Sequence, residues 1–395
     1  MPKSNRTGPG SRWFSRRIAF KLHGWSGFLL SILLLTICLS GTLAVVGNEI
    51  DWLLKPAMRA APQSGPAAWS AIHRNVQALY PEAQVLWLGA PVEPGFAAEA
   101  VIRRHDLNQP WRVYVDPHSG AVQGEASWLT AQRFLRDFHM YLFTPRWGKY
   151  LVTVFGLTML VSMITGIIVY RKWWKGFFTL ERKRGRRVLW GGAHKLLAVW
   201  SLWFVAVMAI TGTWYFIEAL LFDFTDFAYI GLPTVDDDLS EYGPAIPSAD
   251  LDGIVARAKQ EVPSLRVALV RLPTRTNDVI SVQGQTDAVL VRDRTNRVNF
   301  HPFSGELVSV QLAQDLSPAW RWVDTADPLH FGDFGGIWSK LVWFGFGLAL
   351  NAMILTGAWL YLRRVRRLSD RSEAGWALDG LADEPDAAAE ALPRG

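Results

Sequence analysis

Apolar residues gather in four runs that are long enough to cross a bilayer, which takes about 20 apolar residues in a helix. The predicted spans are residues 23–46, 150–170, 195–221 and 337–362. The first run is longer than the roughly 7–15 apolar residues at the centre of a signal peptide. No small-x-small cleavage pattern ends it before Asn48. We therefore expect four retained transmembrane helices.

The two long segments between the spans carry a different pattern, with short β runs beside amphipathic helices. In residues 47–149 and 222–336, a helical stretch, a proline and a strand pattern follow one another. Two further strands then flank a tight turn, "DPHSG" at 116–120 and "HPFSG" at 301–305. Each segment is therefore predicted to form a small α+β domain.

Charge predicts how the chain is oriented in the membrane. Basic residues are dense in 1–22, in 171–194 and at the start of 363–395. The positive-inside rule places these three segments in the cytoplasm and leaves 47–149 and 222–336 outside. The end of the chain is rich in Ala, Pro and acidic residues, so 363–395 is predicted to be a disordered tail. Because topology accounts for the net charge of +6, nucleic-acid binding is not expected.

The two halves of the chain repeat one arrangement of histidine and glycine. Gly41 and Gly212 each lie 18 residues after a histidine, namely His23 and His194. Gly166 and Gly357 each lie 27 residues after a histidine, namely His139 and His330. Each glycine belongs to a Ser-Gly or Thr-Gly pair. Both halves begin and end on the same side, so we expect two parallel repeats about an axis along the membrane normal.

Such an axis would bring His23 to His194 and His139 to His330. Facing neutral imidazoles on bundled helices can supply both axial ligands of a haem iron. The single cysteine, Cys38, lies outside any C-x-x-C-H motif, so covalent c-type attachment is excluded. Eighteen helical residues rise about 27 Å, enough to cross the hydrocarbon core. The pattern therefore predicts two b-type haems, one near each face of the membrane.

Other residues near the histidines fit this hypothesis. Gly27 and Ala198 lie four residues after His23 and His194 and would leave room for a macrocycle. Haem propionates need cations, and the candidates are Lys21 and Lys195 for the inner haem, Lys149 and Lys340 for the outer one. Outer-sphere electron transfer needs no acid or base, so we predict no catalytic residue.

The remaining histidines and the Trp-rich stretch 317–338 have more than one interpretation. His118 and His301 are expected in turns, His73 on a surface helix and His105 in a loop. A non-haem metal site built from these four stays open. The Trp-rich stretch is interpreted as an interfacial aromatic belt, with a docking surface beside the outer haem as the alternative.

Several phrases of the sequence resemble one family. They are "RIAFKLHGWSGF", "DFHMYLF", "GGAHKLLAVWSLWF", "ADPLHFGDFGGIWSKLVWFGFGLA" and the hairpins "VYVDPHSGAV" and "VNFHPFSGELV". Together they resemble the PepSY-associated transmembrane family over most of residues 15–365. The resemblance implies an α-helical membrane bundle with two periplasmic PepSY-like α+β domains in the bacterial inner membrane. "HPFSG" departs from the family pattern, because His301 stands where an aspartate is usual.

The resemblance also extends to inner-membrane, haem-containing ferric-siderophore reductases of the ferrioxamine reductase type. It implies that electrons reach a ferric siderophore in the periplasm and release iron as the ferrous ion. The electron donor stays open between quinol and a soluble cytoplasmic reductase. The alternatives are a PepSY-bearing anchor that binds or inhibits a periplasmic partner, a haem or siderophore permease, and a histidine proton relay.

Overall fold

The computed structural model describes most of the chain and divides it into two compact units. Unit 1 comprises Met1–Thr36, Thr158–Val205 and Ala349–Gly395, and unit 2 comprises Ile37–Leu157 and Ala206–Leu348. The described residues are 16–29, 31–61, 65–180, 185–235, 250–275, 277–288 and 290–382. The basic residues Lys3, Arg6 and Arg12 of the predicted cytoplasmic N-terminus lie outside them.

Three helices are long and apolar enough to cross a membrane. They are α6 (Pro145–Val169), α8 (Leu202–Phe224) and the Gly336–Arg367 part of α11 (Gly336–Ala382). A fourth span exists if α1 (Arg16–Leu29) and α2 (Ser31–Val45), which are bent by 68°, count as one. The chain is therefore a membrane protein with three or four spans. The predicted span 195–221 falls on two helices, because α7 (Arg186–Trp200) ends before α8 begins.

Helix α11 continues well past the predicted end of the fourth span at residue 362. Residues up to Ala382 are helical, although 363–395 was predicted to be a disordered tail. The reason is local, because Arg, Leu and Ala make up more than half of residues 363–382 and are strong helix formers. Residues 383–395 lie outside the described part of the chain.

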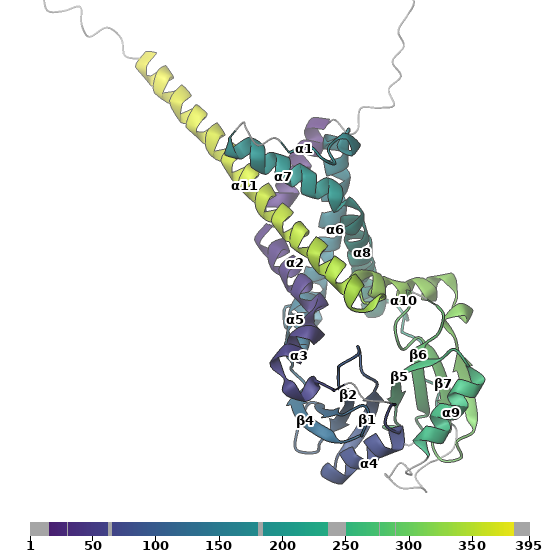
Figure 1. Cartoon of the computed structure of the whole chain (residues 1–395). Coiled ribbons are helices and arrows are strands. Elements are labelled where there is room, and N and C mark those ends of the chain that lie inside the picture. Colours follow the sequence, from purple (N-terminus) through teal and green to yellow (C-terminus); the bar gives the residue numbers. More distant parts are fainter. Residues whose placement is uncertain are drawn as a thin grey trace, which may run out of the picture. The chain divides into compact units, whose positions relative to one another are not determined.

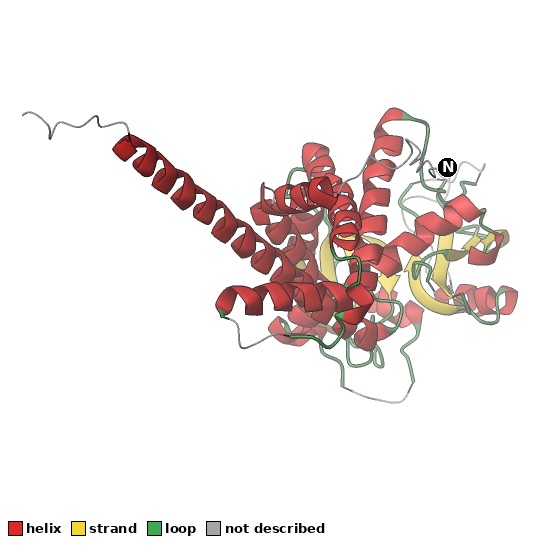
Figure 2. Cartoon of the chain, turned by 90° about the horizontal axis from the view of Figure 1, so that it is seen from above, coloured by secondary structure: helices red, strands yellow, loops and turns green. Residues whose placement is uncertain are grey.

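Unit 2 contains one antiparallel sheet of eight strands in the order β4-β3-β2-β1-β5-β6-β7-β8. Figure 1 labels several of these strands, and Figure 2 shows strands in yellow. The strands are β1 (Gln84–Gly89), β2 (Ala98–Arg103), β3 (Trp111–Val115), β4 (Val122–Ser127), β5 (Arg266–Arg271), β6 (Ile280–Gln285), β7 (Asn296–Phe300) and β8 (Leu307–Gln311). The two predicted α+β domains thus share a single sheet. Helices α4 (Trp69–Leu79) and α9 (Leu251–Glu261) pack on it and on each other.

The two four-stranded halves meet at β1 and β5, and the junction is nearly symmetric. Leu88 faces Val270 at its centre, and both side chains are fully buried. Leu272 N donates to Leu86 O at 3.0 Å, and Ala90 N donates to Ala268 O at 2.9 Å. Each strand would be an unpaired edge in an isolated half, so the pairing satisfies backbone groups that would otherwise be exposed.

The repeated hairpin turns use different side chains in the same role. The Asp116 carboxylate accepts from the amides of His118 at 3.0 Å and Ser119 at 2.7 Å. In the second turn, Nδ1 of His301 accepts from the amides two and three residues on, at 3.4 and 3.0 Å. An imidazole lone pair therefore replaces the carboxylate, which explains how the turn tolerates the departure from Asp.

Two close helix crossings in unit 2 depend on glycine. A Cβ on Gly156 of α6 would lie 2.3 Å from the carbonyl carbon of Gly212 of α8. A Cβ on Gly347 of α11 would lie 2.6 Å from Oγ1 of Thr42 of α2. Small residues let membrane helices approach this closely. The crossing positions correspond between the halves, because Gly41-Thr42 and Gly212-Thr213 occupy the same place in the repeated motif.

We expect Gly156→Ala to lower the melting temperature of the detergent-solubilised protein, because the added methyl forces α6 and α8 apart at a cost of about 1–3 kcal/mol. Gly345→Ala is the matched control, because a Cβ there meets no described atom within 4 Å. The control should melt at or slightly above the wild-type temperature. Equal melting temperatures for the two variants would show that the crossing does not depend on Gly156.

Candidate functional site

The four histidines of the repeat lie in two close pairs. In unit 1 the ring centres of His23 (α1) and His194 (α7) are 6.3 Å apart. In unit 2 the ring centres of His139, on α5 (Ala131–Tyr141), and His330, on α10 (Pro318–Phe331), are 6.1 Å apart. Two imidazoles on opposite sides of one metal ion would show about this separation, with metal–nitrogen bonds of about 2 Å. Direct ring contact covers the same range, about 4.5–7 Å, so the protonation of the rings is the more informative feature.

Hydrogen bonds in unit 1 define which ring nitrogen carries the proton. Nδ1 of His23 is 2.9 Å from the Ser162 carbonyl oxygen of α6. Nδ1 of His194 is 3.1 Å from the Met353 carbonyl oxygen of α11 and 3.1 Å from the Thr356 hydroxyl. A carbonyl oxygen only accepts, so Nδ1 is the donor in both rings. In each neutral ring Nε2 therefore keeps its lone pair.

The pair in unit 2 has the same protonation. Nδ1 of His139 donates to the Ile37 carbonyl oxygen of α2 at 2.9 Å. Nδ1 of His330 is 2.8 Å from the Thr211 hydroxyl of α8. That hydroxyl donates its own proton to Val207 O at 2.7 Å, so it accepts from His330. Both rings again keep the Nε2 lone pair.

The free Nε2 lone pairs make all four rings suitable metal ligands. Within the described part of the chain, no hydrogen-bond partner is found for Nε2 of any of the four rings. Metal-binding histidines usually use one nitrogen for the metal and donate the other N–H to a protein acceptor. The donor set of each pair therefore fits the two axial ligands of a haem.

Glycines of the repeated motif make room for two of the rings and lie beside a third. A Cβ would lie 2.6 Å from Cε1 of His139 if placed on Gly41, and 3.4 Å from Cε1 of His23 if placed on Gly166. On Gly357 it would lie 3.2 Å from Cε1 of His194. The sequence links His23 with Gly41 along the chain, whereas in space Gly166 lies beside His23. The spacing along the chain did not indicate that Gly166 lies beside His23, because the two residues belong to different helices.

Buried surroundings keep the unit 2 pair neutral. Desolvation lowers the pKa of His139, and it lowers the pKa of His330 to about 3, with the neighbouring His139 as the next cause. Helices α5 and α10, which carry these two rings, lie outside the candidate membrane spans. At pH 7 neither ring carries a proton on Nε2, which is the state that a metal ligand requires.

The helices that carry the unit 2 pair are anchored by carboxylates. Asp51 of α3 (Gly47–Leu54) accepts from the amides of Ala131 and Gln132, at 2.9 and 2.8 Å, at the start of α5. On α10, Asp327 accepts from Tyr215 at 2.8 Å and pairs with Arg292 at 2.6 Å. Sequence reasoning missed these anchors. The one signal for Asp327 is its position three residues before His330, on the same helix face.

The four lysines predicted to meet propionates differ in whether they already pair with a carboxylate of the protein. Lys149 pairs with Asp223 at 2.6 Å, and the buried Lys340 pairs with Glu49 at 2.9 Å. Lys21 and Lys195 have no carboxylate partner among the described residues. The inner lysines therefore remain available for an anionic group, whereas the outer two already have carboxylate partners.

The small residues and the other histidines have simple surroundings. A Cβ on Gly27 would meet no described atom within 4 Å, and Ala198 is half-buried on α7. His118 bonds Gly65 O through Nδ1 at 2.7 Å. Among the residues that the structure describes, no cluster of three or more His, Cys, Asp or Glu side chains could hold a metal ion.

Comparison with known proteins gives one family and one relative. A family model described as the PepSY-associated TM region matches residues 20–364, which include all four paired histidines. A Pseudomonas aeruginosa protein named Uncharacterized protein PA4219 is 25% identical over 259 residues. The match covers 61% of this chain and 65% of that protein, so the chain spans just under two thirds of the length of this relative.

The hydrogen bonds predict that the four paired imidazoles carry their proton on Nδ1 in the metal-free protein. Nitrogen-15 solid-state NMR of histidine-labelled protein measures this directly. Thr211→Val removes the acceptor of His330 and should move one ring away from this tautomer. Thr213→Val is the control, because the Thr213 hydroxyl on the same helix has no hydrogen-bond partner among the described residues. Identical spectra for the two variants would contradict the assignment.

Proposed function

Because the chain belongs to the PepSY-associated TM region family, we propose that it is a transmembrane di-haem b electron-transfer protein that reduces ferric siderophores on the periplasmic side. The observation that carries this proposal is the presence of two histidine pairs in which Nδ1 is the donor and Nε2 has no partner among the described residues. The proposed protein would resemble ferrioxamine reductases and would lie in the bacterial inner membrane.

Matching contacts support the arrangement as two parallel repeats. His23 contacts Ser162 and is adjacent to Gly166, whereas His194 contacts Met353 and is adjacent to Gly357. Each residue of the second set lies at the repeat-equivalent position of the first. The two glycine crossings of unit 2 match in the same way. The two halves therefore resemble each other in these helix contacts as well as in the spacing of their histidines and glycines.

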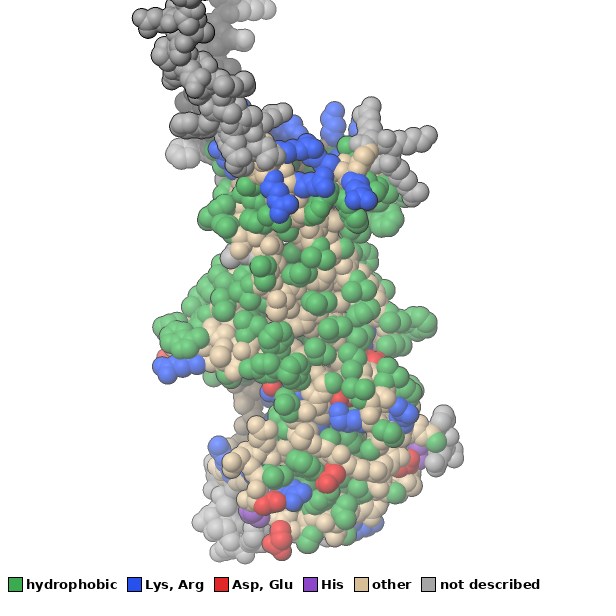
Figure 3. Space-filling model, turned by 90° about the vertical axis from the view of Figure 1, so that its left-hand side faces the viewer, with side chains coloured by type: hydrophobic (Ala, Val, Ile, Leu, Met, Phe, Trp, Pro, Cys, Tyr) green, Lys and Arg blue, Asp and Glu red, His purple; other side chains and the backbone are tan. Residues whose placement is uncertain are grey.

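Charge supports the orientation of the chain. All described Lys and Arg side chains of unit 1 are exposed, and none of its described side chains is Asp or Glu. At the upper end of the view in Figure 3, Lys and Arg side chains gather beside hydrophobic ones, and no acidic side chain is seen among them. By the positive-inside rule, unit 1 would carry the cytoplasmic surface and both termini.

Each histidine has a defined part in the proposal. His23 and His194 would hold the inner haem, and His139 and His330 the outer one. When bound, haem iron would accept and donate single electrons, and two haems would relay them across the bilayer. The hydrogen bonds at Nδ1 fix the ring orientation and make Nε2 a stronger ligand. Lys195, which has no carboxylate partner among the described residues, would meet a propionate.

The Trp-rich stretch 317–338 contributes mainly to packing. Trp320 stacks on Phe227 with ring centres 5.0 Å apart, and Trp322 meets Trp214 at 6.2 Å. Trp338 is 76% exposed at the start of α11 and fits an interfacial belt.

The ferric siderophore would bind to unit 2, which carries the outer histidine pair.

A second candidate is a membrane anchor that binds a periplasmic partner through its sheet. Edge strand β8 favours it, because Leu307, Val308 and Val310 are exposed there. Such an edge can pair with a strand of another protein. This function requires none of the paired histidines, so histidine variants separate the two candidates.

The test uses sealed proteoliposomes that contain a reductant, with ferric siderophore and a ferrous-iron chelator outside. We expect His330→Ala to lose the outer haem and at least about tenfold in reduction rate, while the inner haem is retained. His73→Ala, which changes a histidine of α4 outside both pairs, should keep both haems and the wild-type rate. Equal rates for wild type and His330→Ala would contradict the proposed route.

A further inference from the structure

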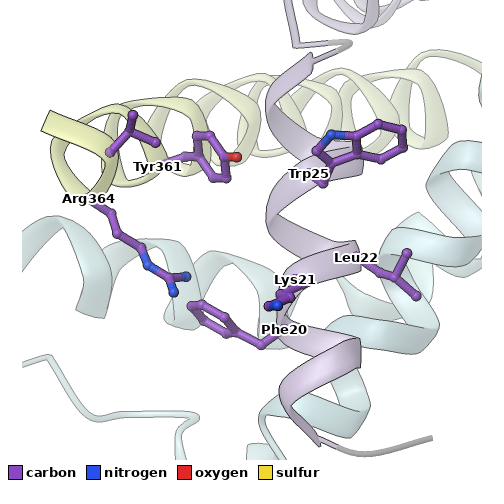
Figure 4. Close-up of a pocket in the computed structure, with 7 residues that line it drawn as sticks. Phe20, Lys21, Leu22, Trp25, Tyr361 and Arg364 are labelled. Carbon is purple, nitrogen blue, oxygen red and sulfur yellow. The ribbon is translucent and has the colours of Figure 1, made fainter. Parts of the chain in front are cut away.

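A groove lies between α1 and the C-terminal part of α11 in unit 1 (Figure 4). It has a volume of about 530 Å³. Its lining residues are Phe20, Lys21, Leu22, Trp25, Tyr361, Arg364 and Val365. Helix α1 supplies the first four and α11 the last three, so an occupant would contact both helices.

Two cations and several apolar side chains share this groove. Arg364 extends from α11 so that its guanidinium carbon is 4.7 Å from the ring centre of Phe20 (Figure 4). Neither Lys21 nor Arg364 has an ion-pair partner among the described residues. The apolar wall is open, since Trp25 is 60% and Val365 46% exposed. The groove thus offers positive charge beside an exposed apolar strip.

The described side chains of unit 1 supply no counter-charge for these cations. No Asp or Glu occurs among the described side chains of unit 1, where every described Lys and Arg is exposed. Among the described residues, the groove therefore presents two cations to an external anion. An apolar strip on a membrane helix favours a ligand that joins an anion to a hydrocarbon chain.

We propose that this groove binds the headgroup of an anionic phospholipid. The phosphate meets Lys21 and Arg364, and an acyl chain lies along Leu22, Trp25 and Val365. The lipid bridges α1 to α11, which already touch where Phe28 stacks on Tyr361 with ring centres 4.5 Å apart. This inference goes beyond the proposed redox function and does not depend on haem.

Charge and proton chemistry distinguish this ligand from a quinol. Oxidation of a quinol releases two protons, and the groove lining contains no carboxylate or imidazole to accept them. Nδ1 of the nearby His23 already donates to Ser162. The groove therefore fits a lipid that is held by charge better than a lipid that is oxidised.

The experiment is native mass spectrometry of the delipidated full chain titrated with phosphatidylglycerol or with phosphatidylcholine. We expect wild type to bind the first phosphatidylglycerol at least tenfold more tightly than phosphatidylcholine. Lys21→Gln with Arg364→Gln should remove this preference. Lys172→Gln with Lys175→Gln is the charge-matched control, because both lysines are exposed in unit 1 outside the groove, and it should keep the preference.

Further variants separate a local loss of charge from misfolding. Lys21→Arg with Arg364→Lys conserves both charges and should bind phosphatidylglycerol as wild type does. If the double Gln variant does not fold, Arg364→Gln alone should still weaken binding several-fold. Equal loss in the control pair, equal affinity for phosphatidylcholine, or displacement of phosphatidylglycerol by a quinone would each overturn the proposal.

Discussion

The proposed function depends on one interaction, the hydrogen bond from Nδ1 of each paired imidazole to an oxygen on a neighbouring helix. A buried polar nitrogen without a partner costs about 1–3 kcal/mol, so each such bond determines how its ring is oriented. Three of the acceptors are helix carbonyls and the fourth is the hydroxyl of Thr211. The consequence is chemical as well as structural, because the proton is held on Nδ1 and the lone pair stays on Nε2.

The same interaction explains one Thr-Gly pair of the repeat. Gly357 admits the edge of the His194 ring, and the Thr356 hydroxyl, which donates to Ala352 O, can accept from Nδ1 of the same ring. An added Cβ would collide with the imidazole at Gly41, at 2.6 Å from His139, whereas at Gly166 it would only touch His23, at 3.4 Å. Two residues of one motif therefore control both the space and the protonation of a histidine on another helix.

Much of the membrane part could be predicted from the sequence, because the length of an apolar run depends only on neighbouring residues. Apolar length predicted α6, α8 and α11, and family membership is confirmed by the match over residues 20–364. The spacing of His23, His194, His139 and His330 indicated which rings lie together, as the two centroid distances show. Haem ligation by these rings stays a prediction.

Features that depend on contacts between distant segments could not be predicted. The edge pairing of Leu88 with Val270 joins two halves that each resemble a separate domain in the sequence. Glu49 and Asp223, the carboxylates that hold Lys340 and Lys149, lie far from them along the chain. The role of His301 as an acceptor in its turn required the geometry of the second hairpin.

The central claim is that each chain holds two haems between paired histidines. Pyridine haemochrome quantitation of protein purified from haem-replete cells measures it most directly. The account predicts two b-type haems per chain, with the split α and β bands of low-spin iron after reduction. A colourless preparation without haem would contradict it.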